Sequence, residues 1–211
     1  WGVQPPPAVT AITNPTANHY RQLTPFGGTA NADTFEVEVQ IDRSDTGQCW
    51  DGTGGWVACA AGAAVRNATL NSGLWAYPPG GESLPPLINN TTFTLSIRGR
   101  NIADIPEVGS GFAHAVTYKV DRTSPTSTLT FPSAGFVNVY PTLTGGVVDA
   151  NNNGVQAGIS EIAVRIRRSN GDSWDQAQGK WVANPSFNAA AYNQPLNQWT
   201  FSATPSSVTW I

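Results

Sequence analysis

The chain has 211 residues, of which 40% are hydrophobic and 12% are charged, with 11 basic and 14 acidic side chains. This near balance of charge excludes the strong positive field that gathers nucleic acid or anionic membrane. No apolar run approaches the roughly 20 residues that cross a bilayer, so we expect no membrane span. The 21 glycines and 16 prolines disfavour long helices and favour short strands between turns, which predicts an all-β protein.

The first alternating run in chain order is residues 35–42, FEVEVQID. Val37, Val39 and Ile41 fall on one face of this run, and polar side chains fall on the other. The pattern predicts a strand with one face buried in a core and one face in water.

A glycine-rich turn between Trp50 and Trp56 follows, flanked by Cys49 and Cys59. It is typical of a β-hairpin. If the turn centres on Gly54, the two cysteines face each other at the Cβ separation that a disulfide requires. We therefore expect a Cys49–Cys59 disulfide, with two free buried thiols as the alternative. A disulfide would indicate an oxidising compartment, and hence secretion or display at the cell surface.

Two further alternating runs occupy residues 91–100 and 115–121. Their apolar positions are Phe93, Leu95 and Ile97 in the first run and Val116, Tyr118 and Val120 in the second. With them the first part of the chain reaches about seven short strands, a number typical of a Greek-key sandwich.

The chain also matches itself at a spacing of roughly 120 residues, which indicates a duplicated unit. The matched pairs are residues 7–20 with 125–140, Gly27-Gly28 with Gly145-Gly146, residues 35–42 with 161–168, Trp50, Asp51 and Trp56 with Trp174, Asp175 and Trp181, Cys49 and Cys59 with Ser173 and Asn184, and Trp75 with Trp199. By this match Ile162, Val164 and Ile166 are predicted to fill a second core.

We therefore predict two domains, residues 1–123 and residues 124–211, joined near residues 121–125. The second copy has no sequence counterpart of the strands at 91–100 and 115–121. Three explanations stay open: a fragment of a longer chain, disorder of the missing part, or a strand donated by another chain. Residues 1–12 of a second copy are the candidate donor.

Residues 120–127, VDRTSPTS, resemble the junction between tandem bacterial immunoglobulin-like domains of very large secreted and surface proteins. That family typically has a valine and isoleucine strand, a Trp-Asp-Gly turn with a second Trp, a later Trp strand and an arginine-containing strand. Here these features are residues 35–42, 50–56 and 98–104 and Trp75, whereas Gln176 replaces the turn glycine in the second copy.

The resemblance implies two tandem immunoglobulin-like Greek-key sandwiches, the second lacking its closing strands. It also implies a role in spacing, adhesion or assembly, with neighbouring immunoglobulin-like domains or identical subunits as partners.

Residues 149–154, DANNNG, place oxygen-bearing side chains at Asp149, Asn151 and Asn153 and a glycine at the sixth position, as a calcium loop does. The twelfth position is Ser160 and Glu161 follows one residue late, so the usual bidentate ligand is out of register. The alternative is a solvated turn rich in Asx residues. Apart from this calcium candidate we expect no cofactor.

The eight tryptophans suggest an alternative function, a carbohydrate-binding module with a glycan or host-surface ligand. Such a module exposes aromatic rings on one face. Trp50, Trp56 and Trp75 recur in the second copy, and we expect them to pack each core. Trp1 and Trp210 lie outside the repeated positions and are candidates for an interface.

The only two histidines, His19 and His114, lie in no recognisable nucleophile, metal or phosphate motif. We therefore expect no enzymatic activity. The sequence favours a structural or adhesive repeat segment of an extracellular surface or fibre protein, which would assemble head to tail if a donated strand completes the second repeat.

Overall fold

The computed structural model describes residues 9–16, 19–60, 64–107, 111–133, 142–150 and 155–202. Within these ranges the regular structure is β-strand with short 3-10 turns and no α-helix, which confirms the predicted all-β class. No helix among the described residues is long and apolar enough to cross a membrane. The chain divides into two compact units, Trp1–Thr123 with Asn151–Gln156 (unit 1) and Ser124–Ala150 with Ala157–Ile211 (unit 2).

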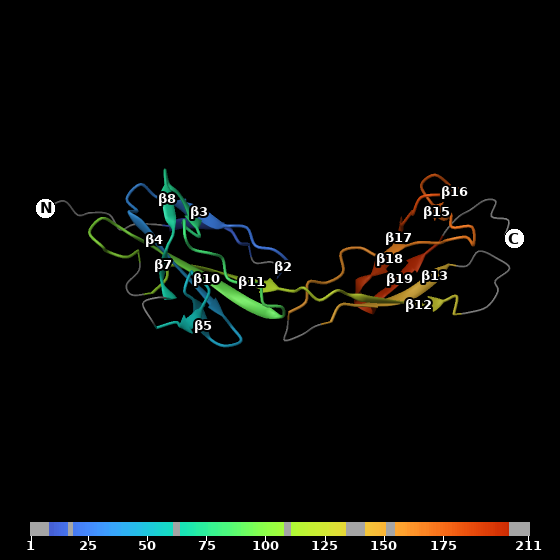
Figure 1. Cartoon of the computed structure of the whole chain (residues 1–211), viewed down its shortest axis with the longest axis horizontal. Coiled ribbons are helices and arrows are strands. Elements are labelled where there is room, and N and C mark those ends of the chain that lie inside the picture. The colour runs from blue at the N-terminus through green and yellow to red at the C-terminus, as the bar shows by residue number, and fades with distance from the viewer. Residues whose placement is uncertain are drawn as a thin grey trace. The chain divides into compact units, whose positions relative to one another are not determined.

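Unit 1 contains two β-sheets (Figure 1). The first sheet has four antiparallel strands in the order β1-β3-β9-β8. Their bounds are Val9–Asn14, Phe26–Ala30, Leu74–Tyr77 and Thr69–Asn71. The strands are short because turn-forming residues interrupt the chain every few positions.

The second sheet of unit 1 has the order β2-β11-β10-β4-β5-β6, and β7 also pairs with β4. The bounds are β2 His19–Tyr20, β11 His114–Val120, β10 Thr91–Arg100, β4 Glu36–Arg43, β5 Gln48–Trp50, β6 Trp56–Ala58 and β7 Arg66–Asn67. β2 runs parallel to β11, whereas the other pairs are antiparallel. The strands predicted at residues 35–42, 91–100 and 115–121 therefore form and lie side by side.

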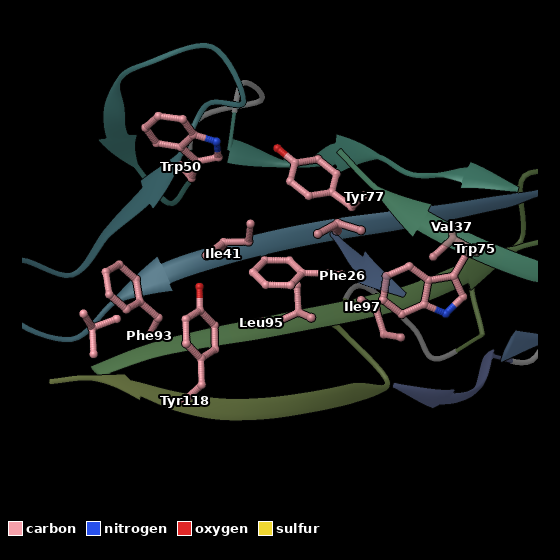
Figure 2. Close-up of a cluster of buried hydrophobic side chains, with 12 residues drawn as sticks. Phe26, Val37, Ile41, Trp50, Trp75, Tyr77, Phe93, Leu95, Ile97 and Tyr118 are labelled. Carbon is pink, nitrogen blue, oxygen red and sulfur yellow. The ribbon is translucent and has the colours of Figure 1, made fainter. Parts of the chain in front are cut away.

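The core of unit 1 lies between these two sheets. Figure 2 shows Phe26 pointing toward Leu95 and Tyr118, and Trp75 lying beside Ile97. Val37 and Val39 are 0% exposed and Ile41 is 2% exposed, which confirms the predicted inward face of β4. Alternation along β10 likewise buries Phe93, Leu95 and Ile97, because successive side chains of a strand point to opposite faces.

Unit 2 repeats the first sheet of unit 1 in the order β12-β13-β19-β18. The strands are Thr126–Phe131, Leu143–Val148, Gln198–Phe201 and Ala191–Asn193, and the 3-10 helix η2 (Gln194–Leu196) lies between the last two in the chain. Two further antiparallel pairs are β14 (Ala163–Val164) with β17 (Asn188–Ala189) and β15 (Ser173–Asp175) with β16 (Lys180–Val182).

A glycine faces the repeated core tryptophan in each unit. Gly28 pairs with Trp75, and Gly145 pairs with Trp199. A Cβ at either glycine would lie 2.0 Å from a backbone oxygen of the neighbouring strand and would also strike the indole. The correspondence is therefore Gly28 with Gly145, and the predicted match of Gly27-Gly28 to Gly145-Gly146 is wrong by one residue. A double glycine is conspicuous in the sequence, but only one glycine of each pair is needed for this close approach.

The predicted strand at residues 161–168 is shorter than its counterpart in unit 1. Only Ala163–Val164 is strand, followed by an isolated bridge between Arg167 and Ser173. Ile162 is 8% exposed, whereas Val164 and Ile166 are only partly buried against the same cluster. The inward face is as predicted, but the core that it faces is shallower.

Candidate functional site

The disulfide between Cys49 and Cys59 forms as expected, with a Cα–Cα distance of 4.9 Å. The predicted register of the hairpin is wrong, however. Trp50 pairs with Trp56 and Cys49 pairs with Val57, so the turn centres on Thr53 rather than Gly54. Cys59 lies beyond the end of β6 and reaches Cys49 diagonally rather than from the opposite position.

The carboxylate of Asp51 explains this register. Asp51 Oδ1 accepts hydrogen bonds from the backbone N–H groups of Thr53, Gly54 and Gly55 at 2.8, 3.0 and 2.9 Å. These three donors stabilise the charged form and lower the pKa of Asp51 to about 2. Gly52, at φ +86°, takes the left-handed conformation that the turn needs, and the turn therefore closes around the carboxylate.

Unit 2 contains the same hairpin without the disulfide. Trp174 pairs with Trp181 in β15 and β16, and the turn between them is one residue longer than the turn between Trp50 and Trp56. The ring centroids are 5.6 Å apart, compared with 5.3 Å between Trp50 and Trp56. Ser173 replaces Cys49 and is 0% exposed, so the fold of this hairpin does not require a disulfide.

An arginine covers the outer tryptophan of each hairpin. The guanidinium carbon of Arg43 lies 5.0 Å from the centroid of Trp56, and that of Arg168 lies 4.6 Å from the centroid of Trp181. A salt bridge of 2.6 Å fixes each arginine, from Arg43 to Asp45 and from Arg168 to Asp172. This repeated arginine was not predicted, although each one ends an alternating run of the sequence and precedes the turn to the hairpin.

Different polar residues lie next to the inner tryptophan of each hairpin. In unit 1, Arg66 forms an ion pair with Glu82, and Trp50 Nε1 donates to the carbonyl of Ser83 at 2.8 Å. Burial and the nearby Glu82 carboxylate raise the pKa of Tyr77. In unit 2, the buried Asn188 has the strand position of Arg66 and donates to the carbonyl of Trp174 at 3.0 Å. A neutral amide thus replaces an ion pair.

The described tryptophans do not form an exposed aromatic surface. Four of them are between 2% and 6% exposed: Trp50, Trp75, Trp174 and Trp199. The other two, Trp56 and Trp181, are partly buried beneath their arginines. Trp1 and Trp210, the two candidates for an interface, lie outside the described residues.

Charged groups gather where β4 and β10 pair in unit 1. Glu38 forms ion pairs with both Arg98 and Arg100, and Arg100 also contacts Asp104 at 2.8 Å. His114 Nε2 lies 3.0 Å from Glu107 Oε1. The Glu38 pairs join two neighbouring strands, and the other two contacts link β10 and β11 to the loop between them, which is the arrangement of a structural ion network.

The calcium candidate is described only in part. Asp149 is 6% exposed, and its Oδ2 accepts a hydrogen bond of 2.7 Å from the N–H of Gly158. Asn151 and Asn153 lie outside the described residues. Among the residues that are described, no group of three or more His, Cys, Asp or Glu side chains could hold a metal ion. Calcium binding at this loop therefore stays a prediction.

No family model matches the chain, and no curated protein matches it.

Proposed function

We propose that this chain is a non-enzymatic structural and adhesive segment of an extracellular protein, built from tandem immunoglobulin-like sandwiches. The strand order of unit 1 supports this proposal. Strands β1-β3-β9-β8 take the order A-B-E-D of an immunoglobulin fold, and β11-β10-β4-β5-β6 take the order G-F-C-C′-C″ of its second sheet.

The observation that carries the proposal is the recurrence of one packing scheme in both units. The glycine and tryptophan pair, the tryptophan hairpin and the covering arginine occur in each unit at corresponding strand positions. Among the described residues, the six tryptophans pack in or over the two cores, and the two cysteines form the disulfide. A repeated unit of this kind suits a spacer, whose function is to hold its shape.

The Cys49–Cys59 disulfide supports an extracellular location, because disulfides persist in oxidising compartments. The test is antibody labelling of intact cells of the organism that makes the protein. We expect labelling at the surface or on secreted material without permeabilisation. Labelling that appears only after the cells are lysed would overturn the proposal. A glycan array gives a second test, in which specific binding of a sugar would replace the spacer role with sugar recognition.

A further inference from the structure

Residues 161–168 of unit 2 take the place of β4 of unit 1, as their backbone partners show. The N–H of Ala68 donates to Val37 O, and that of Ala190 donates to Ile162 O, each at 2.9 Å. In the same register, residues 38 and 39 pair with 67 and 66, and residues 163 and 164 pair with 189 and 188. Finally, residue 42 pairs with 49 and residue 167 with 173. Ile162 therefore corresponds to Val37, and Arg167 to Asp42, so the predicted match of residues 35–42 with 161–168 is wrong by one residue.

All these bonds lie on one edge of the segment. In unit 1 the other edge of β4 pairs with β10 along its whole length. In unit 2, no strand among the described residues pairs with that edge of residues 161–168.

An apolar side chain of β12 in unit 2 is correspondingly exposed. Ile12 of β1 pairs with Gly28 and packs against the core of unit 1, where β1 contacts β10 and β11. Leu129 of β12 holds the corresponding position opposite Gly145 but is 56% exposed. A strand in the position of β10 would pair with the unpaired edge, and a second strand beside it would cover Leu129.

The charges along this edge define the strand that fits it. In unit 1 the outward pairs across β4 and β10 are Glu36 with Arg100, Glu38 with Arg98, Gln40 with Ser96 and Asp42 with Thr94. The corresponding outward residues of unit 2 are Glu161, Ala163, Arg165 and Arg167, all exposed. Arg165 donates to Ser173 Oγ at 2.9 Å and its guanidinium carbon lies 6.0 Å from the centroid of Phe187, both on the paired side of the segment, so Arg165 leans away from the unpaired edge.

We propose that the unpaired edge of residues 161–168 binds an extended strand of another polypeptide segment, in which apolar side chains alternate with carboxylates. The carboxylates face Arg165 and Arg167, an uncharged residue faces Ala163, and a basic residue faces Glu161. Opposite charges at directly facing positions stabilise a strand pair, and like charges destabilise it.

The composition of the chain argues that the partner strand comes from elsewhere. None of the residues outside the described ranges is Asp or Glu. Among the described strands, the one in which acidic and apolar residues alternate is β4, and it is already paired on both edges. The candidate donor named from the sequence, residues 1–12, is also unsuited, because Val9–Asn14 forms β1 and pairs with β3 of its own unit.

Synthetic peptides based on β10 test the proposal. The acidic peptide has the sequence of Thr91–Arg100 with the changes Thr94→Glu, Ser96→Glu and Arg98→Thr. The control peptide carries Lys at positions 94 and 96 and is otherwise identical. With the full chain at low salt, fluorescence anisotropy should show the acidic peptide binding at least tenfold more tightly than the control. Hydrogen exchange should show new protection at residues 160–168.

A charge exchange on the protein sharpens this test. The variant Arg167→Glu changes an exposed side chain. It should lower the affinity of the chain for the acidic peptide and raise its affinity for the lysine peptide. Arg21→Glu changes an exposed arginine of unit 1 and should leave both affinities unchanged. Circular dichroism of each variant verifies that the chain is folded.

Four results would overturn the proposal. They are equal affinity for the two peptides, binding of neither peptide, protection that appears outside residues 160–168, and full protection of residues 160–168 before any peptide is added. In the last case sedimentation separates the alternative occupants: a dimer indicates a second copy of the chain, and a monomer indicates the chain's own residues.

Discussion

Units 1 and 2 share one hairpin and one four-stranded sheet but differ in how completely their cores are closed. The core cluster of unit 1 contains 12 buried residues, whereas that of unit 2 contains four among its described residues. Five of the 12 come from β10 and β11: Phe93, Leu95, Ile97, Tyr118 and Val120. The repeated hairpin forms by pairing of neighbouring residues, whereas the depth of burial depends on strands from far along the chain.

The largest effect should come from a charge placed on the inward face of β4. Val39 is 0% exposed, so Val39→Asp buries an unpaired carboxylate and should destabilise unit 1 by about 4 kcal/mol. Val164→Asp should cost unit 2 clearly less, because Val164 is only partly buried. Urea unfolding of both variants measures the difference. Leu74→Asp, at a position 62% exposed, is the control and should change little. Equal losses of stability for Val39→Asp and Val164→Asp would contradict the conclusion that the core of unit 2 is less buried than that of unit 1.

Removal of the disulfide should make the hairpin of unit 1 resemble that of unit 2. The double variant Cys49→Ser and Cys59→Asn copies the residues Ser173 and Asn184. Loss of a short cross-linked loop should cost roughly 3 kcal/mol through the entropy of the unfolded chain. Unit 1 should still fold, since the hairpin of unit 2 forms without the bond. Thermal unfolding measures the cost, and failure of the variant to fold would show that the two hairpins are not equivalent.

Replacement of the glycine that faces the core tryptophan should destabilise both units by a similar amount. Gly28→Ala and Gly145→Ala each place a Cβ against a backbone oxygen and an indole, which should cost roughly 1–3 kcal/mol. Gly80→Ala is the matched control, because a Cβ there meets no atom within 4 Å. Chemical unfolding followed by tryptophan fluorescence gives the values. If Gly28→Ala lowered the stability of unit 1 but Gly145→Ala left that of unit 2 unchanged, β12 would be able to move away from the added Cβ.

The smallest effect should be the acid sensitivity of the first hairpin. The folded pKa of Asp51 is about 2, below its usual 3.8, so its contribution to stability is complete above pH 3.8 and is lost as the pH falls toward 2. Asp51→Asn keeps an oxygen acceptor but removes the charge. The melting temperature of this variant should fall less than that of the original chain between pH 4 and pH 2. Asp33→Asn, in an exposed turn, serves as the control. Identical pH profiles for the Asp51→Asn variant and the original chain would show that the carboxylate does not stabilise the turn.

The sequence by itself determined the features that depend on near neighbours. Alternation placed Val37, Val39 and Ile41 inward, the tryptophan spacing identified both hairpins, and the order of the repeated residues indicated the duplication. These features follow from a period of two along a strand and from turn chemistry, both of which act over a few residues.

The tertiary structure decided what depends on contacts between distant segments. It assigned Gly145 rather than Gly146 to the core tryptophan, because β12 must approach β13 closely at that residue. It also left one edge of residues 161–168 unpaired. Hydrophobic patterning gives the face that a strand buries, but the strand's partner and the depth of burial depend on which other segments pack against it.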